Sequence, residues 1–315
     1  MRMTRPRAWL ALLLVCSLLG GRAGADPPAD EIIVNATRMG PRLWHVQQGG
    51  AQLWILGTVS PLPIGVTWRA GEVERLLGHA SVVLAAKPLE ISLPRVLWIL
   101  IAQRDLVMIK GGAKLRDVLP PDLYERFAVQ RAKYAGRSDK WERYRPIIAA
   151  ALLEDAALQK NGLSARLDVS LAVRRLARKH HVRIDEVKIP GAPDLLDALK
   201  NVAPEAESRC VASIVGTVES GLPLLAQRAD AWSSGDLERM QSLPESTEAS
   251  CGVSLSADAG AAGVLAQIHR RWLEALEAQL HGTATSVAVL DVDLLLGPGG
   301  LLEALRAEGF AVDAP

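Results

Sequence analysis

The stretch LWHVQQGGAQLWILGTV, residues 43–59, contains the clearest strand pattern in the sequence. Its two apolar halves flank the polar, glycine-containing segment 47–50, a pattern typical of antiparallel strands joined by a tight turn. The loop residues Pro61 and Pro63 follow the second half. Residues 43–59 therefore predict a β-hairpin.

Outward from this hairpin, short apolar runs alternate with longer helical patterns. The run SVVLA at 81–85 is continuously apolar and β-branched, as in a strand that is buried on both faces. Further strands are expected at 182–188, 286–293 and 310–312, and helices at 71–79, 120–134, 141–158, 168–181, 204–231 and 261–280. Strands at both ends with helices between them predict an α/β (α+β) fold. Its central mixed β-sheet is formed from N- and C-terminal segments, with a large helical insert at about 115–281.

Two of the expected helices have an apolar face that predicts which residues point inward. In the helix at 141–158 these are Ile147, Ala150, Ala151 and Leu153. In the helix at 168–181 they are Leu171, Val173, Leu176 and Ala177. The basic residues of the second helix are expected on its solvent face.

The amino terminus predicts export. Arginines at positions 2, 5 and 7 precede an apolar run at 8–20, and the small residues Ala23-Gly-Ala25 follow. This pattern predicts a signal peptide at 1–25 that is cut after Ala25, then a flexible segment at 26–40 and a single domain at 41–315. A retained membrane anchor is the competing interpretation, but the apolar run is short for a span of about 20 residues. Cys16 raises a lipoprotein as a third interpretation, although Val15 before it fits a lipobox poorly.

Composition describes an ordinary globular protein. The chain has 315 residues, of which 49% are hydrophobic and 23% charged, and its formal net charge is +1. That charge gives no indication of a nucleic-acid partner or of acidic lipid. No second apolar segment of membrane-spanning length is expected, which predicts a periplasmic or secreted protein without stable membrane insertion.

Two cysteines remain once the signal peptide is removed. An even pair in an oxidising compartment most simply forms a structural disulfide, here between Cys210 and Cys251. Two free thiols that act in catalysis or metal binding are the alternative. Neither cysteine lies in a CxxC or nucleophile motif, which favours the disulfide.

Several segments together resemble the TraB/GumN family, which includes the TIKI-type proteases and is related to the ChaN/erythromycin-esterase group. PRLWHV at 41–46 followed by LWILGTV at 53–59 resembles the opening hairpin of the family and its G-T-x-H motif. RPIIAA at 145–150 resembles its helical insert, and the W-x-x-G-D pattern recurs at 232–236. The closing stretch, from VAV at 287–289 to GFAV at 309–312, resembles the end of the family's sequence. The resemblance covers nearly the whole mature chain in the right order and implies the family's fold.

The resemblance also implies a metal site whose residues this chain lacks. In the family, a histidine after the first strand, a glutamate on the next strand and a histidine on the last strand are thought to hold a divalent metal. Here the first position, after Gly57 and Thr58, is Ser60, and the second falls on Ala85 or Ala86. The third aligns with Asp293 or with Leu294, depending on the direction of counting. Losing two or three ligands should remove tight metal binding, because alanine has no donor atom and a neutral hydroxyl is a weak ligand.

Other positions match the family, or lie where it has site residues. Asp168 and Glu186 match acidic family positions, and His269 lies where the family has an R-N pair before a tryptophan. Asp291 and Asp293 are expected to alternate along the last strand and so to face one side. There they would join Asp168 in an all-oxygen site for a divalent metal. The competing interpretation is that one of the two aspartates caps the following turn while the other meets solvent or an arginine.

The leading hypothesis is an exported pseudoenzyme that retains a cleft for a ligand or peptide and needs no cofactor. The vestigial cleft candidates are Gly57, Thr58, Ser60, Asp168, Glu186, His269, Asp291 and Asp293. One alternative is a periplasmic hydrolase or peptidase with a rebuilt carboxylate site that uses a Mn- or Co-type metal. Another is a structural partner protein that acts through its helical insert. The partner is expected to be a peptide or protein of unknown identity.

Overall fold

The predicted hairpin is the first element of the fold. In a computed structural model, β1 (Leu43–Gln48) pairs antiparallel with β2 (Ala51–Thr58), with Leu43 opposite Leu56. Gly49 at the turn has a φ of 56°, a left-handed conformation that glycine adopts without steric cost. The structure describes residues 40–87, 104–165, 167, 169–190, 200, 202–245, 259–297 and 299–315. These residues belong to one compact unit, Arg38–Pro315.

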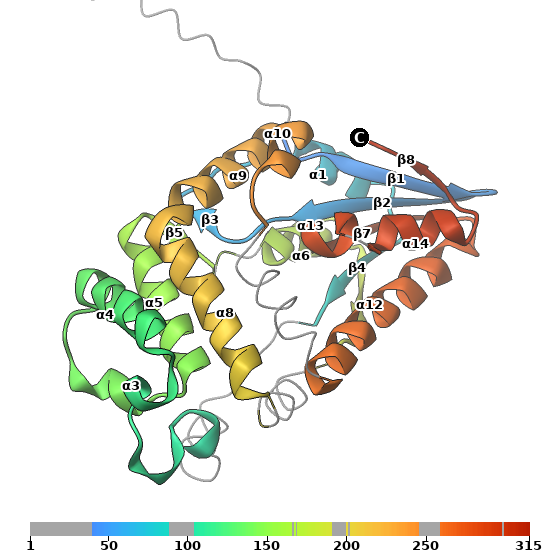
Figure 1. The fold of residues 1–315 in the computed structure, drawn as a ribbon. Coiled ribbons are helices and arrows are strands. Elements are labelled where there is room, and N and C mark those ends of the chain that lie inside the picture. Colours follow the sequence, from blue (N-terminus) through green and yellow to red (C-terminus); the bar gives the residue numbers. More distant parts are fainter. Residues whose placement is uncertain are drawn as a thin grey trace, which may run out of the picture. The chain divides into compact units, whose positions relative to one another are not determined.

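A six-stranded mixed sheet joins the two ends of the chain. Its order is β6-β4-β7-β2-β1-β8, where the strands not yet introduced are β4 (Val82–Ala86), β6 (Arg183–Val187), β7 (Thr285–Asp291) and β8 (Ala311–Asp313). Figure 1 shows the blue β1 beside the red β8. β6, β4, β7 and β2 run parallel, so all four end at the same edge of the sheet. The predicted fold class is confirmed.

Helices cover the apolar strands of the sheet. α12 (Ala259–Leu280) contacts β1, β2 and β6, and α6 (Val169–Lys179) contacts β4, β6 and β7. α1 (Gly71–Leu77) packs on α6, and α14 (Leu301–Ala307) packs on α12 and β8. Because β2, β4 and β7 are buried almost throughout, they carry the continuous apolar runs that identified them in the sequence.

A second hydrophobic core lies in the helical part of the chain. It is formed by the helices α3 (Leu115–Val118), α4 (Pro121–Tyr134), α5 (Pro146–Lys160) and α8 (Pro204–Gly216). Phe127 on α4 is its largest fully buried side chain. A two-stranded sheet, β3 (Leu62–Pro63) with β5 (Leu163–Ser164), links the loop after β2 to the end of α5.

One helix contributes to both cores. α8 continues through a π-helical turn (Thr217–Gly221) into α9 (Leu222–Ser234), and α10 (Leu237–Ser242) follows. Pro223 explains the wider turn, since it has no N–H to donate to the preceding turn. The expectation that no later segment is long and apolar enough to span a membrane was wrong, because Pro204–Ser234 meets that criterion by length and composition. Its apolar residues fill the two cores, as in a core helix of a globular protein.

Two details of the helix predictions were wrong. The helix expected to begin at Trp141 begins at Pro146 instead, and residues Asp139–Arg143 form a separate 3₁₀ turn. Proline disfavours helical geometry in the residue before it and fits the first turn of a helix. Ala151 and Leu171, which were expected to point inward, are exposed, Leu171 to 44%.

Candidate functional site

The carboxyl ends of the parallel strands bring the sequence-predicted positions to one edge. We define the strand-end site as five residues: Thr58 at the end of β2 and Ser60 after it, Ala86 at the end of β4, Asp291 at the end of β7, and Asp293 beyond it. Thr58 and Asp291 are direct neighbours in the register of β2 and β7. Ligand sites in open α/β sheets lie at this edge, so this is where a functional site is expected.

The last strand ends two residues earlier than predicted. β7 stops at Asp291, and Asp293 and Leu294 both lie on a short helix, α13 (Val292–Leu296). Asp291 caps that helix, because its Oδ1 accepts a hydrogen bond from the Asp293 backbone N–H at 2.7 Å. The expectation that Asp291 and Asp293 alternate along one strand is therefore wrong. The competing interpretation, a capping aspartate followed by one that meets an arginine, is confirmed.

Asp293 forms a buried ion pair with Arg228 of α9. Arg228 Nη1 donates to Asp293 Oδ2 at 3.1 Å, and Nη2 donates to Oδ1. The two side chains are only 7% and 11% exposed. This two-pronged geometry is the strongest form of an arginine–carboxylate contact and engages both carboxylate oxygens. Both carboxylate oxygens of Asp293 are therefore hydrogen-bonded to the guanidinium group.

A second buried arginine lies at the ends of β4 and β6. Arg174 of α6 donates from Nη2 to the Ala86 carbonyl at 2.6 Å and from Nη1 to Glu186 Oε1 at 3.3 Å. The expectation that all basic residues of this helix face solvent is wrong for Arg174, whose side chain is 5% exposed. Ala85 and Ala86, the two positions at which the family resemblance places a glutamate, supply no side-chain ligand. A guanidinium group bonded to a backbone carbonyl lies beside them.

Gly57 is required by close packing at the end of β2. The Trp232 Nε1–H donates to its carbonyl at 2.7 Å, and a Cβ placed on Gly57 would lie 2.8 Å from the Trp44 ring and 3.0 Å from Val292. The neighbouring Thr58 hydroxyl donates to the Leu290 carbonyl at 3.2 Å. Gly57 and Thr58 thus fasten β2 to β7 and α9.

We expect Gly57→Ala to lower the free energy of unfolding by about 1–3 kcal/mol, the cost typical of overpacking a core. Gly263 on α12 is the matched control, because a Cβ there would meet nothing within 4 Å. Gly263→Ala is expected to raise stability by about 0.5–1 kcal/mol, since alanine favours a helix more than glycine does. Urea unfolding of both variants measures the two effects. Equal effects would contradict the packing described for Gly57.

The remaining sequence candidates are not part of the strand-end site as described. His269 lies on α12, and its Nε2 is buried without a hydrogen-bond partner among the residues that the structure covers. Asp168 lies outside the described residues. Cys210 is buried in the second core and disulfide-bonded, while its predicted partner Cys251 lies outside the described residues.

The family's metal does not fit the residues found here. Within the described ranges, no three His, Cys, Asp or Glu side chains lie together in a way that could hold an ion. Ser60 and Ala86 stand where strong ligands would be needed. Asp291 serves as a helix cap, and Asp293 is bound by Arg228.

Sequence reasoning missed Arg228 and used Trp232 only as part of the W-x-x-G-D pattern, although the helical spacing contained a signal for both. Leu225, Arg228 and Trp232 follow one another at intervals of three and four residues and are all buried. They therefore share one face of α9. An arginine on an otherwise apolar face needs a buried acidic partner, and the aspartates near the last strand were the obvious candidates.

Comparison with known proteins agrees with this picture of the fold. A family model, the TraB/PrgY/gumN family, matches residues 42–314. No curated protein and no solved structure matches the chain. The match extends from β1 to β8 and so includes every strand of the sheet. The chain belongs to the TraB/PrgY/gumN family.

Proposed function

We propose that this chain is an exported, non-catalytic member of its family, in which the strand-end site holds a ligand or peptide and performs no hydrolysis. The proposal combines the signal-peptide pattern of residues 1–25 with the geometry of the strand ends. The fold and the topology of the site support a ligand-binding position that the chain shares with its family. The side chains at that position support the loss of hydrolytic activity.

The observation that carries the proposal is the pair Asp293–Arg228. A rebuilt metal site was the strongest alternative, and it relied on Asp291 and Asp293 as oxygen ligands. A guanidinium group already neutralises Asp293 through both carboxylate oxygens. Replacing it with a divalent cation would leave a buried Arg228 unpaired, which is strongly unfavourable.

Charge in the rest of the site supports the same proposal. A divalent ion that acts as a Lewis acid needs three or more protein ligands and an open position for water. Here Arg174 brings a second positive charge to the ends of β4 and β6 and engages Glu186. Carboxylates that already have arginine partners are less available to hold a metal, which supports a site without metal-dependent chemistry.

Two other functions stay open to test. A metal-dependent hydrolase would draw on Glu186, whose side chain is 43% exposed, together with Asp291 and Asp168. A partner protein that acts through the helical part would use exposed apolar residues such as Val129 and Leu152. These two residues lie on α4 and α5.

The test is metal binding by the protein purified as the cell processes it. Direct metal analysis after dialysis against Mn²⁺, Co²⁺, Zn²⁺ or Ca²⁺ is expected to give no stoichiometric metal, and thermal unfolding is expected to show no shift in Tm. A genuine site at 100 times its Kd would stabilise the protein by about 2.7 kcal/mol, which thermal unfolding detects readily.

A matched pair of variants makes the result specific. Asp291→Asn removes a charge from the strand-end site while asparagine can still cap α13. Glu125→Gln removes a charge from the exposed surface of α4. Stoichiometric metal that is lost in Asp291→Asn and kept in Glu125→Gln would overturn the pseudoenzyme proposal in favour of the hydrolase.

A further inference from the structure

Cationic side chains line a hollow in the helical part of the chain. The residues of this hollow are separate in sequence from those of the strand-end site. The volume of the hollow is about 860 Å³, and its walls are the segments 104–116 and 139–143. This volume lies within the range of small-molecule sites, about 300–1,000 Å³. We call this hollow the cationic pocket. It contains no residue of the strand-end site.

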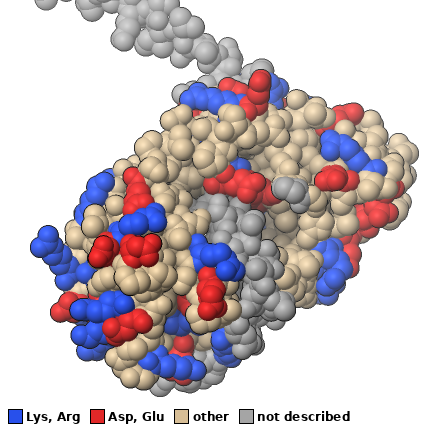
Figure 2. Space-filling model, viewed as in Figure 1, with Lys and Arg blue, Asp and Glu red and all other residues tan. Residues whose placement is uncertain are grey.

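The charge of the cationic pocket is far from balanced. Six cationic side chains line it together with three carboxylates, an excess of three positive charges. The cations are Arg104, Lys110, Lys114, Arg116, Lys140 and Arg143. The whole chain has a formal net charge of only +1, so this excess is local and not a sign of a basic protein. Charges of both signs are interspersed on the molecular face shown in Figure 2.

Backbone hydrogen bonds fasten the two walls to each other. The Ile109 N–H donates to the Arg143 carbonyl at 2.9 Å, and the Arg145 N–H donates to the Val107 carbonyl at 2.9 Å. Met108 and Tyr144 form an isolated β-bridge between these bonds. Backbone pairing of residues about 35 apart in the chain thus holds the two walls of the pocket together.

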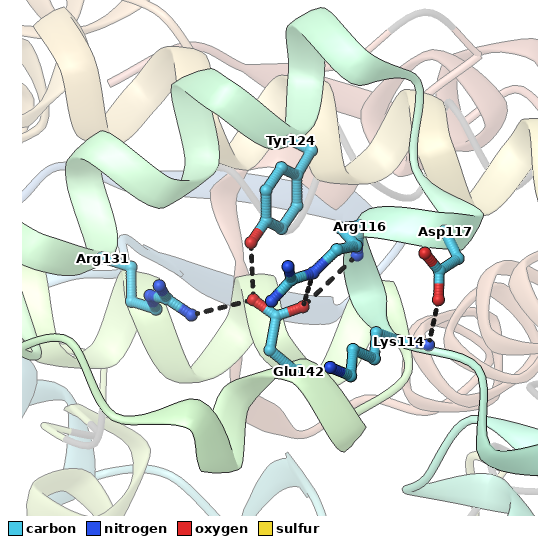
Figure 3. Close-up of polar contacts among 6 residues, drawn as sticks. All are labelled: Lys114, Arg116, Asp117, Tyr124, Arg131 and Glu142. Atoms are coloured by element: carbon cyan, nitrogen blue, oxygen red, sulfur yellow. Dashed lines mark hydrogen bonds and ion pairs between the residues drawn. The ribbon is translucent and has the colours of Figure 1, made fainter.

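The most buried carboxylate of the pocket, that of Glu142, already has hydrogen-bond partners. Glu142 accepts hydrogen bonds from the Tyr124 hydroxyl at 2.6 Å, from Arg131 Nη1 at 3.3 Å and from Arg116 (Figure 3). Asp105 forms an ion pair with Lys110 at 3.4 Å. Within the described part of the chain, four of the cations, Arg104, Lys114, Lys140 and Arg143, have no ion-pair partner, and neither has the Asp139 carboxylate. These four cations and one carboxylate account for the excess of three positive charges.

The loop between Lys110 and Lys114 lets a ligand approach the backbone. Gly111 and Gly112 have φ values of 68° and 76°, and a Cβ on either would meet nothing within 4 Å. Left-handed conformations at consecutive residues favour glycine. The absence of side chains leaves the main chain open beside the cations, an arrangement that suits a compact anion.

We propose that the cationic pocket binds a small phosphate-bearing anion. A phosphate monoester carries about 1.5–2 negative charges at pH 7, and a diphosphate carries more, so the excess of three positive charges matches one such ligand. Arginine and lysine are the side chains that proteins use for phosphate, the first as a two-pronged donor and the second as a point charge. The proposal extends beyond the function proposed for the strand-end site and does not depend on it.

Titration with inorganic pyrophosphate, followed by isothermal calorimetry at low salt, tests this proposal. Binding with one site per chain is expected, with affinity that falls as NaCl is raised from 20 to 200 mM, because the Debye length shortens from ~21 to ~7 Å. Arg143→Gln combined with Lys140→Gln is expected to weaken binding at least tenfold. Arg306→Gln combined with Arg239→Gln, exposed cations of α14 and α10, is the matched control and should leave Kd unchanged.

Each other outcome overturns the proposal. Absence of pyrophosphate binding to a folded protein would contradict it directly. Equal weakening in both double variants would show non-specific attraction by surface charge. Binding to phosphatidylglycerol vesicles, but neither to phosphatidylcholine vesicles nor to pyrophosphate, would assign the cations to a lipid headgroup in place of a soluble ligand. Circular dichroism and Tm confirm that each variant is folded.

Discussion

Replacing Asp293 by alanine is expected to lower the free energy of unfolding by about 3–5 kcal/mol, the range found when one partner of a buried ion pair is removed. The loss is large because Arg228 is only 7% exposed and would remain charged without its carboxylate. Arg228→Ala should lower the free energy of unfolding by a similar amount, since it leaves Asp293 buried and charged without its partner. Urea unfolding followed by circular dichroism measures both.

Two controls separate this pair from surface electrostatics. Arg126 and Glu219 also form a two-pronged contact, but their side chains are 45% and 28% exposed, so Glu219→Ala should cost only about 0–1 kcal/mol. The double variant Arg228→Met with Asp293→Leu removes both buried charges. It is expected to unfold much closer to the wild type than either single variant. A small effect of Asp293→Ala would contradict the buried pair and would reopen Asp293 as a candidate ligand.

Glu142→Ala is expected to lower the free energy of unfolding by about 3 kcal/mol near neutral pH, since Arg131 would lose a buried partner. The side chain of Glu142 is only 5% exposed and that of Arg131 only 10%. Tyr124 would lose its hydrogen-bond acceptor at the same time. Both losses affect the second hydrophobic core, because Tyr124 packs against it.

The same carboxylate predicts a pH dependence of stability. Burial acts to raise the pKa of Glu142, but hydrogen bonds from the Tyr124 hydroxyl and from Arg116, with the charge of Arg116, outweigh it and lower that pKa below its ordinary value. A lowered pKa in the folded state means that the stabilising contribution is full above the unfolded-state pKa of about 4.3. It is lost as the pH falls through the folded-state pKa.

The stability difference between wild type and Glu142→Ala should therefore be largest above pH 5 and should shrink below about pH 4. Urea unfolding at a series of pH values measures it. Glu74→Gln is the matched control: its pKa is also lowered, by Lys179 and His180, but at the solvent-exposed surface. A difference for Glu142→Ala that does not change with pH would show that lost packing, not lost charge, destabilises the variant.

Sequence patterns predicted the sheet because its central strands consist of continuous apolar runs. That pattern predicted the hairpin at 43–59, the strand at 81–85 and the pairing of C-terminal segments with the same sheet. All three are confirmed. The error at 291–293 arose where two signals compete. Val287 to Val292 favours a strand, but Asp291 followed by an apolar run is also a helix N-cap pattern, and the cap prevails.

The burial of Arg174 is the part of the site that patterns along the chain did not predict. Arg174 is one of several basic residues on its helix, and only its tertiary contact with the Ala86 carbonyl and Glu186 distinguishes it from the others. The cationic pocket was missed for a similar reason. Its cations come from two segments that are brought together by the Met108–Tyr144 bridge, which no local periodicity reveals.

The pairing of β2 with β7 also determines when this protein is able to fold. Ser286 and Gln52 touch although 234 residues separate them, and β1 pairs with β8 near the end of the chain. A ribosome must therefore deliver almost the entire polypeptide before the central strands find their neighbours. Contacts of such long sequence separation slow folding. The segments that contain β7 and β8 must therefore be synthesised before the sheet can be completed.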